Sequence, residues 1–409
     1  MSQTLTLEIA QQLKAEAEDR FDADDTYYIK ASLHTSITDE AAEALAKHHG
    51  ELYLDSLTSL SDAAAEALAQ HERELSLGGL TSLSDGAAEA LAKHQGWRLI
   101  LDGLTSLSDG AAEALAPHKC ELILDGLTSL SDGAAEALAK HKGELSLRGL
   151  TSVSDAAAQA LAKHEGKWLN LNGLTSLSDG AAQALAQRED NLYLNGLTSL
   201  SDGAAEALAK HDGHLYLDGL TILSDAPGHV ALLEKHDGYL SLKGLTSLSD
   251  AAAQALAKRK EELSLGGLTS LSDAAAQALA KHQGRMLNLG GLTSLSDAAA
   301  QTLAKYEGDL WFEGMTSLSD AAAEALAKHK RDLYLNGLTS LSDAAAKALA
   351  QHEGYLSLNR LTSLSDAAAQ ALAQHEGGHY ALKVQFGALP PEDLHRYETY
   401  RQQHRAAKA

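Results

Sequence analysis

The sequence predicts an α/β solenoid, in which each stacked unit contains one short strand and one short helix. The segment GLTSLSDAAAQALA at residues 244–257 recurs letter for letter at 267–280, and similar units of 23 to 25 residues fill most of the chain. A fixed period of this length indicates units that bury their apolar faces only against their neighbours. Hydrophobic residues make up 44% of the chain and aromatic residues only 4%, so the core must be aliphatic.

Three segments are expected. Residues 1–28 form an N-terminal helical cap, residues 29–379 a solenoid of about fifteen units, and residues 380–409 a C-terminal strand and helix cap. Fourteen units align on a first leucine, and a degenerate fifteenth begins near Ile29. The first leucines are Leu52, Leu75, Leu99, Leu122, Leu145, Leu169, Leu192, Leu215, Leu240, Leu263, Leu287, Leu310, Leu333 and Leu356.

Each unit begins with a strand pattern. In residues 52–74, Leu52 and Leu54 alternate with other residues, which is the period of a strand with one buried face. Leu57 and Leu60 follow in the segment LTSLSD and are expected to turn inward. The unit therefore places its leucines on one side and leaves the intervening positions on the opposite side.

The second half of each unit predicts a helix. Ser61 supplies an N-cap and Asp62 a carboxylate near the helix N-terminus. The segment AAAEALA that follows is a strong helix former. The helix is expected to end near His71, and many copies have a glycine just beyond, as at Gly166.

Both ends carry sequences that differ from the repeat. A capping helix is expected near the N-terminus and a further, longer strand at residues 379–386, followed by a helix after Pro390 and Pro391. The apolar residues expected on one face of the N-terminal helix are Leu5, Ile9, Leu13, Ala17 and Phe21. Those expected on one face of the C-terminal helix are Leu394, Tyr397 and Tyr400. Inside the solenoid, Pro227 and Gly228 interrupt one expected helix and could kink it.

The unit LxLxxLTSLSDxAAxALA resembles those of leucine-rich repeat proteins, and its spacing is closest to the cysteine-containing subtype. Two departures stand out: leucine occupies the polar Asn/Cys position, as at Leu57 and Leu80, and the upstream leucine of the family pattern is absent. The first departure removes the side-chain-to-backbone ladder of the family. The resemblance implies a binding scaffold without naming a ligand.

The geometry of such a unit predicts curvature. Parallel strands stack about 4.8 Å apart, whereas helices rarely approach closer than about 8 Å. The row of helices is therefore longer than the row of strands. We expect a curved horseshoe or superhelix with the parallel strands on the concave face and the short helices on the convex face.

Candidate binding residues lie where the units differ from one another. Three positions flank the two strand leucines and face away from them, so strand alternation places them on the concave face. Aromatic residues occupy these positions in neighbouring units, and exposed Tyr and Trp anchor protein interfaces. The candidates are Tyr53, Trp168, Tyr193, Tyr216, Tyr239, Trp311, Tyr334 and Tyr355. The alternative is that Tyr and Trp merely suit strands.

Charge narrows the expected partner. The chain has 33 Lys and Arg against 56 Asp and Glu, a formal charge of −23, which disfavours nucleic acid and anionic membranes. The three variable positions hold twelve acidic residues, seven before the first leucine and five after the second, and three basic ones. Asp102, Asp125 and Arg148 are included among the candidate contacts. We expect a protein partner with a basic patch.

Other repeated polar residues are possible chemical sites. Twelve units carry a histidine after the helix. A row of metal sites would need histidines of neighbouring units to lie closer together than the expected 8–10 Å. A cationic or hydrogen-bonding group at the helix C-terminus is therefore favoured. The complete Asp column, from Asp39 to Asp366, could suggest calcium or acid–base catalysis, but helix N-terminal stabilisation explains every copy. Threonines in the turn, such as Thr58, resemble ice-binding arrays only weakly. Cys120 could be reactive beside Lys119 or could be an incidental small residue.

The sequence thus predicts a non-enzymatic protein-binding scaffold, with no cofactor and no metal site, because an active site needs one unique cluster. The alternative is a structural or surface-active array, or a secreted effector, in which repetition itself is the function. The first residues lack a signal peptide pattern and Cys120 is the single cysteine, so a cytoplasmic location is expected, with export by a specialised system as the alternative. The oligomeric state is left open.

Overall fold

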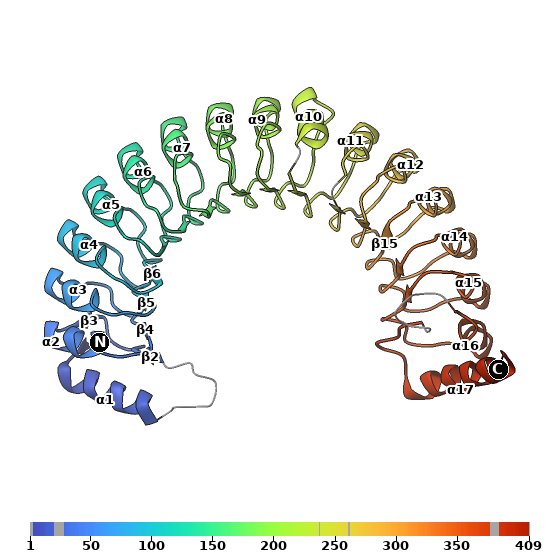
Figure 1. Ribbon diagram of the computed structural model, residues 1–409, viewed down its shortest axis with the longest axis horizontal. Coiled ribbons are helices and arrows are strands. Elements are labelled where there is room, and N and C mark those ends of the chain that lie inside the picture. Colours follow the sequence, from blue (N-terminus) through green and yellow to red (C-terminus); the bar gives the residue numbers. More distant parts are fainter. Residues whose placement is uncertain (1–2, 20–27, 237, 261, 377–383, 409) are drawn as a thin grey trace. The chain divides into compact units, whose positions relative to one another are not determined.

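The computed structural model describes residues 3–19, 28–236, 238–260, 262–376 and 384–408. The chain divides into two compact parts, residues 1–216 and 217–409, which we call unit 1 and unit 2. Each is described by itself, and the word unit without a number still means one sequence repeat. In each, short strands follow one another along one side and the helices lie along the other (Figure 1). The helices are spread more widely than the strands, so the strands lie on the inner side of the curve within each unit (Figure 1).

Unit 1 contains strand, turn and helix in regular alternation. Its strands are β1 (Thr4–Leu5), β2 (Tyr28–Lys30), β3 (Ser36–Ile37), β4 (Glu51–Tyr53), β5 (Leu75–Ser76), β6 (Arg98–Ile100), β7 (Glu121–Ile123), β8 (Leu145–Ser146), β9 (Leu169–Asn170), β10 (Leu192–Tyr193) and β11 (Leu215–Tyr216). Its helices are α1 (Leu7–Asp19), α2 (Asp39–Ala46), α3 (Asp62–Leu68), α4 (Asp85–Leu91), α5 (Asp109–Leu115), α6 (Asp132–Leu138), α7 (Asp155–Leu161), α8 (Asp179–Leu185) and α9 (Asp202–Leu208).

Unit 2 continues the same alternation. Its strands are β12 (Leu240–Ser241), β13 (Leu263–Ser264), β14 (Met286–Asn288), β15 (Asp309–Trp311), β16 (Leu333–Tyr334) and β17 (Leu356–Ser357). Its helices are α10 (Pro227–Lys235), α11 (Asp250–Leu256), α12 (Asp273–Leu279), α13 (Asp297–Leu303), α14 (Asp320–Leu326), α15 (Asp343–Leu349), α16 (Asp366–Leu372) and α17 (Pro391–Lys408).

The strands are parallel and keep one register. In unit 1, Leu52 of β4 is opposite Leu75 of β5, and each following strand places its first leucine opposite the next. Strands β13 to β17 of unit 2 do the same, as with Leu310 and Leu333. A shift of one residue would turn every leucine to the opposite face, so this register fixes which residues are buried.

The core is aliphatic, as expected. Both strand leucines and the leucine that follows them are fully buried, as Leu52, Leu54 and Leu57 illustrate at 0% exposure. Helix alanines and one helix leucine complete the packing. Leu60 was expected to turn inward, but it is only half-buried, as is its counterpart in most units. Because it precedes the N-cap directly, it lies at the rim between the turn and the helix.

The helix N-terminus was predicted closely, and it also connects the units. Ser131 caps α6 by accepting a hydrogen bond from Ala134 N at 3.0 Å. The same Ser131 hydroxyl donates to Asp109 Oδ1, the first residue of the preceding helix α5. This Ser–Asp contact recurs between successive units, as from Ser61 to Asp39 at 2.6 Å. Each serine therefore stabilises its own helix and binds it to the preceding one.

Two further rows of hydrogen bonds replace the side-chain-to-backbone ladder that the repeat pattern lacks. Thr246 Oγ1 donates to the carbonyl of Thr221 at 3.2 Å, and Thr269 Oγ1 donates to that of Thr246 at the same distance. Where Asp or Asn follows the second strand leucine, its side chain accepts from the next unit, as Asn172 Oδ1 accepts from Asn195 N at 3.0 Å. The turn threonines are thus engaged within the solenoid and do not form a free hydroxyl array.

The loop that follows each helix places one side chain in a buried row, present in each of the two units, that we call the helix-end column. It comprises His48, His71, His94, His118, His141, His164, Arg188, His211, His236, Arg259, His282, Tyr306, His329, His352 and His375, all at most 6% exposed. Neighbouring imidazole rings stack with nearly parallel planes: the centroids of His118 and His141 are 6.0 Å apart and those of His141 and His164 are 5.9 Å apart. This spacing is shorter than the 8–10 Å expected, because the column lies between the strands and the more widely spaced helices.

The cationic role expected for these histidines was wrong. Burial lowers the pKa of His94, His118 and His164 to about 4, and a second cause in each case is a neighbouring charged or titratable side chain of the column. The rings are therefore neutral at pH 7. In the part of the chain that the structure describes, no group of three or more His, Cys, Asp or Glu side chains could hold a metal ion.

The substituted positions show what the column contacts. Arg188 donates from Nη1 to the carbonyl of His164 at 2.8 Å and from Nη2 to that of Gly166 at 3.2 Å. Tyr306 donates its hydroxyl to the carbonyl of Gly284 at 2.8 Å. His71 Nδ1 lies 3.4 Å from the carbonyl of Ala46. Each residue type faces backbone carbonyls of the preceding unit, so the column connects adjacent loops.

The N-terminal segment differs from the expected helix. Leu5 lies in β1, which pairs with β3, and not in the helix; the helix α1 begins at Leu7. Ala10 and Ala17 are its buried residues, whereas Ile9 and Leu13 are half-buried. Phe21 lies outside the described residues. The four-residue spacing had grouped a strand residue with the helix.

The C-terminal segment is also partly different. Helix α17 buries Tyr397 at 1% exposure, but Leu394 is 39% exposed, and Asp393 and Arg401 are buried instead. The Tyr400 hydroxyl donates to Asp366, the last member of the Asp column, at 2.9 Å. Of the expected strand at residues 379–386, positions 379–383 lie outside the described residues, and Gln385 forms an isolated parallel bridge with Ser357.

The irregular unit has no helix interrupted by proline. Pro227 is the first residue of α10, where a missing N–H costs nothing, and Gly228 follows it. The preceding Ala226 offers no side-chain cap. Ser224 contacts His229 Nδ1 through its hydroxyl at 2.6 Å. The two extra residues of this unit therefore move the helix start and leave its interior regular.

Candidate functional site

The strand face is the surface formed by the residues that flank the strand leucines. In unit 1 it carries a row of three aromatic rings on β9 to β11. The centroids of Trp168 and Tyr193 are 5.9 Å apart with planes at 71°, and those of Tyr193 and Tyr216 are 4.6 Å apart with planes at 8°. All three side chains are half-buried. The parallel register places Tyr193 opposite Tyr216, whereas Trp168 directly precedes β9 and Asn170 is the residue opposite Tyr193.

Unit 2 carries a second row on β15 to β17. The centroids of Trp311 and Tyr334 are 4.3 Å apart, and those of Tyr334 and Tyr355 are 5.5 Å apart. Each of these rings is half-buried. Tyr239 precedes β12 in the same unit and is also half-buried. The structure thus places the predicted aromatic candidates of each unit on its strand face.

The stacking decides which part of a ring is available. Tyr193 and Tyr216 lie face to face along the row, so each covers one ring face of the other. Tyrosine is amphipathic, with a hydroxyl group and an apolar ring edge.

Tyr53 lies apart from these rows, and sequence reasoning missed its neighbour Tyr28. Tyr28 is 51% exposed, and its ring packs edge-on against Tyr53 with centroids 5.9 Å apart. The Tyr53 hydroxyl donates to Glu51 Oε2 at 2.6 Å, and burial together with this carboxylate raises the pKa of Tyr53. Tyr28 precedes a degenerate unit whose first apolar residue is Ile29, so alignment on leucine could not reveal it.

The charged candidates contribute to the structure of the sheet edge. Asp125 Oδ1 accepts from the Ser146 hydroxyl at 2.6 Å and from Arg148 N at 3.0 Å. Asp102 Oδ1 accepts from Asp125 N at 3.2 Å. The guanidinium of Arg148 is 3.9 Å from Asp125 Oδ2 and largely exposed. One oxygen of each carboxylate thus accepts hydrogen bonds from the next strand, and the second oxygen of Asp125 faces Arg148.

Arg98 forms a compact ion cluster that sequence reasoning did not single out. Its Nε lies 2.5 Å from Glu121 Oε2 and its Nη1 lies 3.4 Å from Glu74 Oε2, while its guanidinium carbon lies 4.4 Å from the Trp97 ring centroid. Burial raises the pKa of Glu74, and Arg98 opposes that shift. Two of the twelve acidic residues on the strand face therefore share the charge of one guanidinium.

Cys120 has the properties of a structural cysteine. Its side chain is partly buried, and burial raises the pKa of its thiol, with Lys119 opposing the shift only weakly. Thiolate chemistry requires a lowered pKa. The reactive alternative considered for this residue therefore has no support in its surroundings.

No protein-family model matches the sequence, and none of the curated proteins matches it. Its fold is similar to that of several solved structures. A leucine-rich repeat protein of Leptospira interrogans has a TM-score of 0.42 and 18% identity over 97% of this chain and 92% of that one. An internalin from Listeria monocytogenes has a TM-score of 0.34 and 16% identity over 91% and 95%. TLR13 in complex with ssRNA13 has a TM-score of 0.40 and 16% identity over 82% and 63%.

The fold assignment rests on the geometry of the chain itself. Each unit places two leucines on a short parallel strand, a third in the turn and a capped helix on the opposite side, and the next unit repeats this in register. Among the described residues, none of the helices is long and apolar enough to cross a membrane. The chain is therefore a solenoid of repeated strand–turn–helix units with the leucine spacing of leucine-rich repeats.

Proposed function

We propose that the chain is a non-enzymatic scaffold that binds a protein partner through its strand face. The observation that carries the proposal is the pair of aromatic rows, Trp168–Tyr193–Tyr216 in unit 1 and Trp311–Tyr334–Tyr355 in unit 2, whose rings touch across consecutive strands. Large, rigid and half-buried aromatic residues lose little entropy when a partner covers them.

The partner surface that fits best is apolar with a basic patch. The exposed Asp102 and Glu144 lie on the same face of unit 1, before the row that begins at Trp168. In unit 2, Asp309 and Asp332 flank the second row, and burial followed by the charge of Asp332 raises the pKa of Asp309. A lysine or arginine of the partner would relieve this repulsion between carboxylates.

The test replaces aromatic rings in both rows. A Tyr193→Ala, Tyr216→Ala, Trp311→Ala variant is expected to lose partner capture from the source cell by at least about tenfold, because interface aromatics often contribute 2 kcal/mol or more each. The matched control changes three exposed helix residues, Glu89, Glu113 and Glu136, to alanine. It should capture the same partner as the unaltered chain.

Melting and partner capture must be compared for the same variant. Loss of capture with both strand and helix signals retained supports the binding scaffold. If the triple aromatic variant captures every partner as well as the unaltered chain does, the scaffold proposal fails. A structural array, in which repetition itself is the function, would then be the better explanation, and assembly of the purified chain would be unaffected by the substitutions.

A further inference from the structure

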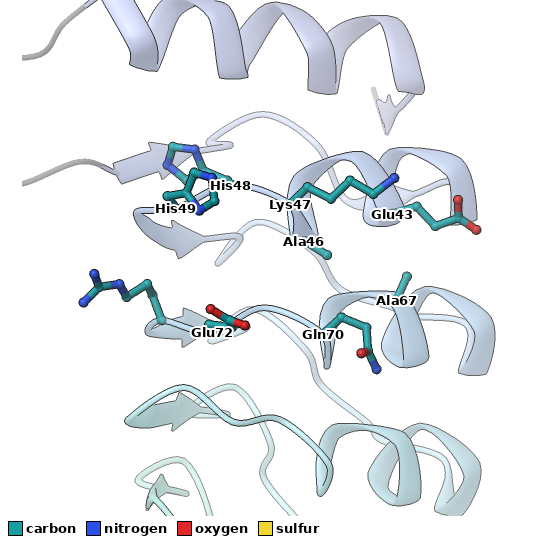
Figure 2. Close-up of a pocket in the computed structure, with 9 residues that line it drawn as sticks. Glu43, Ala46, Lys47, His48, His49, Ala67, Gln70 and Glu72 are labelled. Carbon is teal, nitrogen blue, oxygen red and sulfur yellow. The ribbon is translucent and has the colours of Figure 1, made fainter.

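Grooves open between successive helices at the edge where the helices end. In unit 1 one such groove, of about 500 Å³, lies between α2 and α3 (Figure 2). In unit 2 another, of about 880 Å³, lies between α13 and α14. Because the units repeat, the two grooves can be compared residue by residue.

The two grooves differ mainly in charge. The groove of unit 1 is lined by Glu43, Ala46, Lys47, His48, His49, Ala67, Gln70, Glu72 and Arg73. At the corresponding positions, the groove of unit 2 is lined by Gln301, Ala304, Lys305, Tyr306, Glu307, Ala325, Lys328, Lys330 and Arg331. The first contains two carboxylates and two Lys or Arg side chains, whereas the second contains one carboxylate and four.

Figure 2 shows the arrangement in unit 1. Glu43 lies on α2 and Lys47 directly after it, Ala67 lies on α3, and Gln70 and Glu72 lie in the loop that follows α3. In unit 2, Gln301 replaces Glu43, Lys328 replaces Gln70 and Lys330 replaces Glu72. Three substitutions therefore convert a balanced groove into a strongly cationic one.

The cations of the unit 2 groove have few partners within the described chain. No ion pair within 4.0 Å is described there for Lys305, Lys328, Lys330 or Arg331. Arg331 Nε donates to the carbonyl of Glu307 at 3.3 Å, which positions its guanidinium and leaves its terminal nitrogens for other acceptors. The hydroxyl of Tyr306 is already used by Gly284. Positively charged side chains around one cavity raise its affinity for anions.

The neighbouring groove of unit 2 shows that the excess is local. Between α14 and α15, Glu324 and Glu353 stand with the same Lys328 and Lys330, so that groove is balanced again. Lys328 and Lys330 border both grooves, whereas Arg331 lines only the cationic one of the two; where residues 330 and 331 are Lys-Arg, the corresponding residues 165 and 166 are Glu-Gly. In a chain with a formal charge of −23, such a concentration of cations is unexpected from composition alone.

We propose that the groove between α13 and α14 binds a multivalent oxyanion of the phosphate class. Four cations against Glu307 leave a charge of about three, which one triphosphate chain or two phosphate monoesters would match, whereas a carboxylate ligand would need three separate groups. Lysine acts as a point charge toward phosphate, and arginine adds paired hydrogen bonds. The three lysines lie at the helix ends, whereas Arg331 also borders the strand face beside Asp309 and Asp332.

Binding of inorganic triphosphate to the full chain, measured by calorimetry at low and at physiological salt, tests the proposal. We expect one site per chain that weakens with salt. The Lys330→Glu, Arg331→Gly variant restores the Lys-His-Glu-Gly sequence of residues 163–166, so it should fold. It should bind triphosphate at least about tenfold more weakly, since the groove charge falls to about zero.

A matched graft provides the converse experiment. Glu43→Gln, His49→Glu, Gln70→Lys and Glu72→Lys together give the groove of Figure 2 the charges of the unit 2 groove. This variant should bind two triphosphates per chain in place of one. Absence of binding by the unaltered chain, or binding that the Lys330→Glu, Arg331→Gly variant retains in full, overturns the proposal.

Two peptides of equal charge distinguish the source of the anion. If a doubly phosphorylated serine peptide competes with triphosphate and binds at least as tightly, the natural ligand is a phosphorylated protein. If triphosphate binds and the peptide does not, the natural ligand is a free polyphosphate. Either result supports a phosphate site. A glutamate peptide that binds as tightly as both overturns the phosphate assignment.

Discussion

The helix-end column takes one side chain from each repeat and the strand face takes three, and the two respond to sequence change in different ways. In the column, His, Arg and Tyr all face carbonyl groups of the preceding unit, as Arg188 and Tyr306 show by direct hydrogen bonds. On the strand face, residues at one equivalent position have different partners: Glu121 pairs with Arg98, whereas Trp168 packs on Tyr193. Variation alone therefore does not mark a functional surface. The test is whether the substitute keeps the same partner.

This difference predicts different sensitivities. A change in the helix-end column should alter stability, because it removes a buried connection between units. A change on the strand face should alter binding with little effect on stability. Lowering the pH and introducing single substitutions can each test this distinction, and lowering the pH should reduce the stability of the chain most.

The largest effect should come from acid. His48, His94, His118, His164, His329 and His375 have their pKa lowered to about 4 by burial, whereas in the unfolded chain it is about 6.5. The unfolded state therefore binds more protons as the pH falls from 6.5 to 4. The stability present above pH 6.5 is lost through this window, by roughly 1–3 kcal/mol for each ring.

Urea unfolding followed by circular dichroism at pH 7.5, 6.5, 5.5 and 4.5 measures this loss. The midpoint should fall steeply below pH 6.5. A variant with His94→Tyr, His118→Tyr and His164→Tyr, which places in three units the residue type that the column has at Tyr306, should show a shallower dependence even if its absolute stability changes. An unfolding midpoint that does not change between pH 7.5 and 4.5 would contradict neutral burial of the column.

A single truncation in the column comes next. His141 is fully buried between the rings of His118 and His164, so His141→Ala should leave a cavity and destabilise the chain by about 2–4 kcal/mol. The control is Glu144→Ala three residues later on the exposed strand face, with an expected change within about 0.5 kcal/mol. Denaturant melts of the two variants compare them directly, and equal losses would remove the distinction between column and face.

Much of this fold could be predicted from the sequence, and the part that could not has a physical reason. The alternation at Leu52 and Leu54 identifies the strand, and Ser61 with Asp62 identifies the helix start, because both signals act over a few neighbouring residues. The column was misjudged because His71 stands in a polar loop sequence, Gln-His-Glu-Arg, that looks exposed. Its burial depends on the preceding unit, which local periodicity does not register.

The candidate site was predicted in part for the same reason. Position within the strand sufficed to place Tyr193 and Tyr216 on one face, but their stacking depends on distances between strands. Asp125 was expected to contact a partner, whereas half of its carboxylate serves Ser146 and Arg148 N. The cationic groove was missed because its four cations come from two units and are surrounded by an acidic chain. Comparison of the loop segments 163–166 and 328–331 would have signalled it.

The Ser–Asp row should show an intermediate sensitivity. Ser131→Ala removes both the cap on Ala134 N and the donor to Asp109, and the cap alone accounts for about 1 kcal/mol. Ser129, two residues earlier, is exposed, and Ser129→Ala should change stability by less than about 0.5 kcal/mol. Thermal melts of the two variants distinguish the serine that connects units from the one that only fills the turn, and similar melting temperatures would contradict the dual role of Ser131.

The smallest effect is the most specific test of the comparison. Arg188→His replaces a buried guanidinium by the residue that most units use, and the donors to His164 and Gly166 carbonyls are lost while the ring stacks on its neighbour. Burial lowers the pKa of Arg188. Because the exchange removes this desolvated charge together with its hydrogen bonds, the two effects oppose each other, and the free energy of unfolding should change by no more than about 1 kcal/mol. Arg188→Met keeps the volume but leaves the carbonyls of His164 and Gly166 without their donor, and it should cost about 1–3 kcal/mol. If methionine is tolerated as well as histidine, volume alone defines the column, and contact with the preceding carbonyls is not what its residues share.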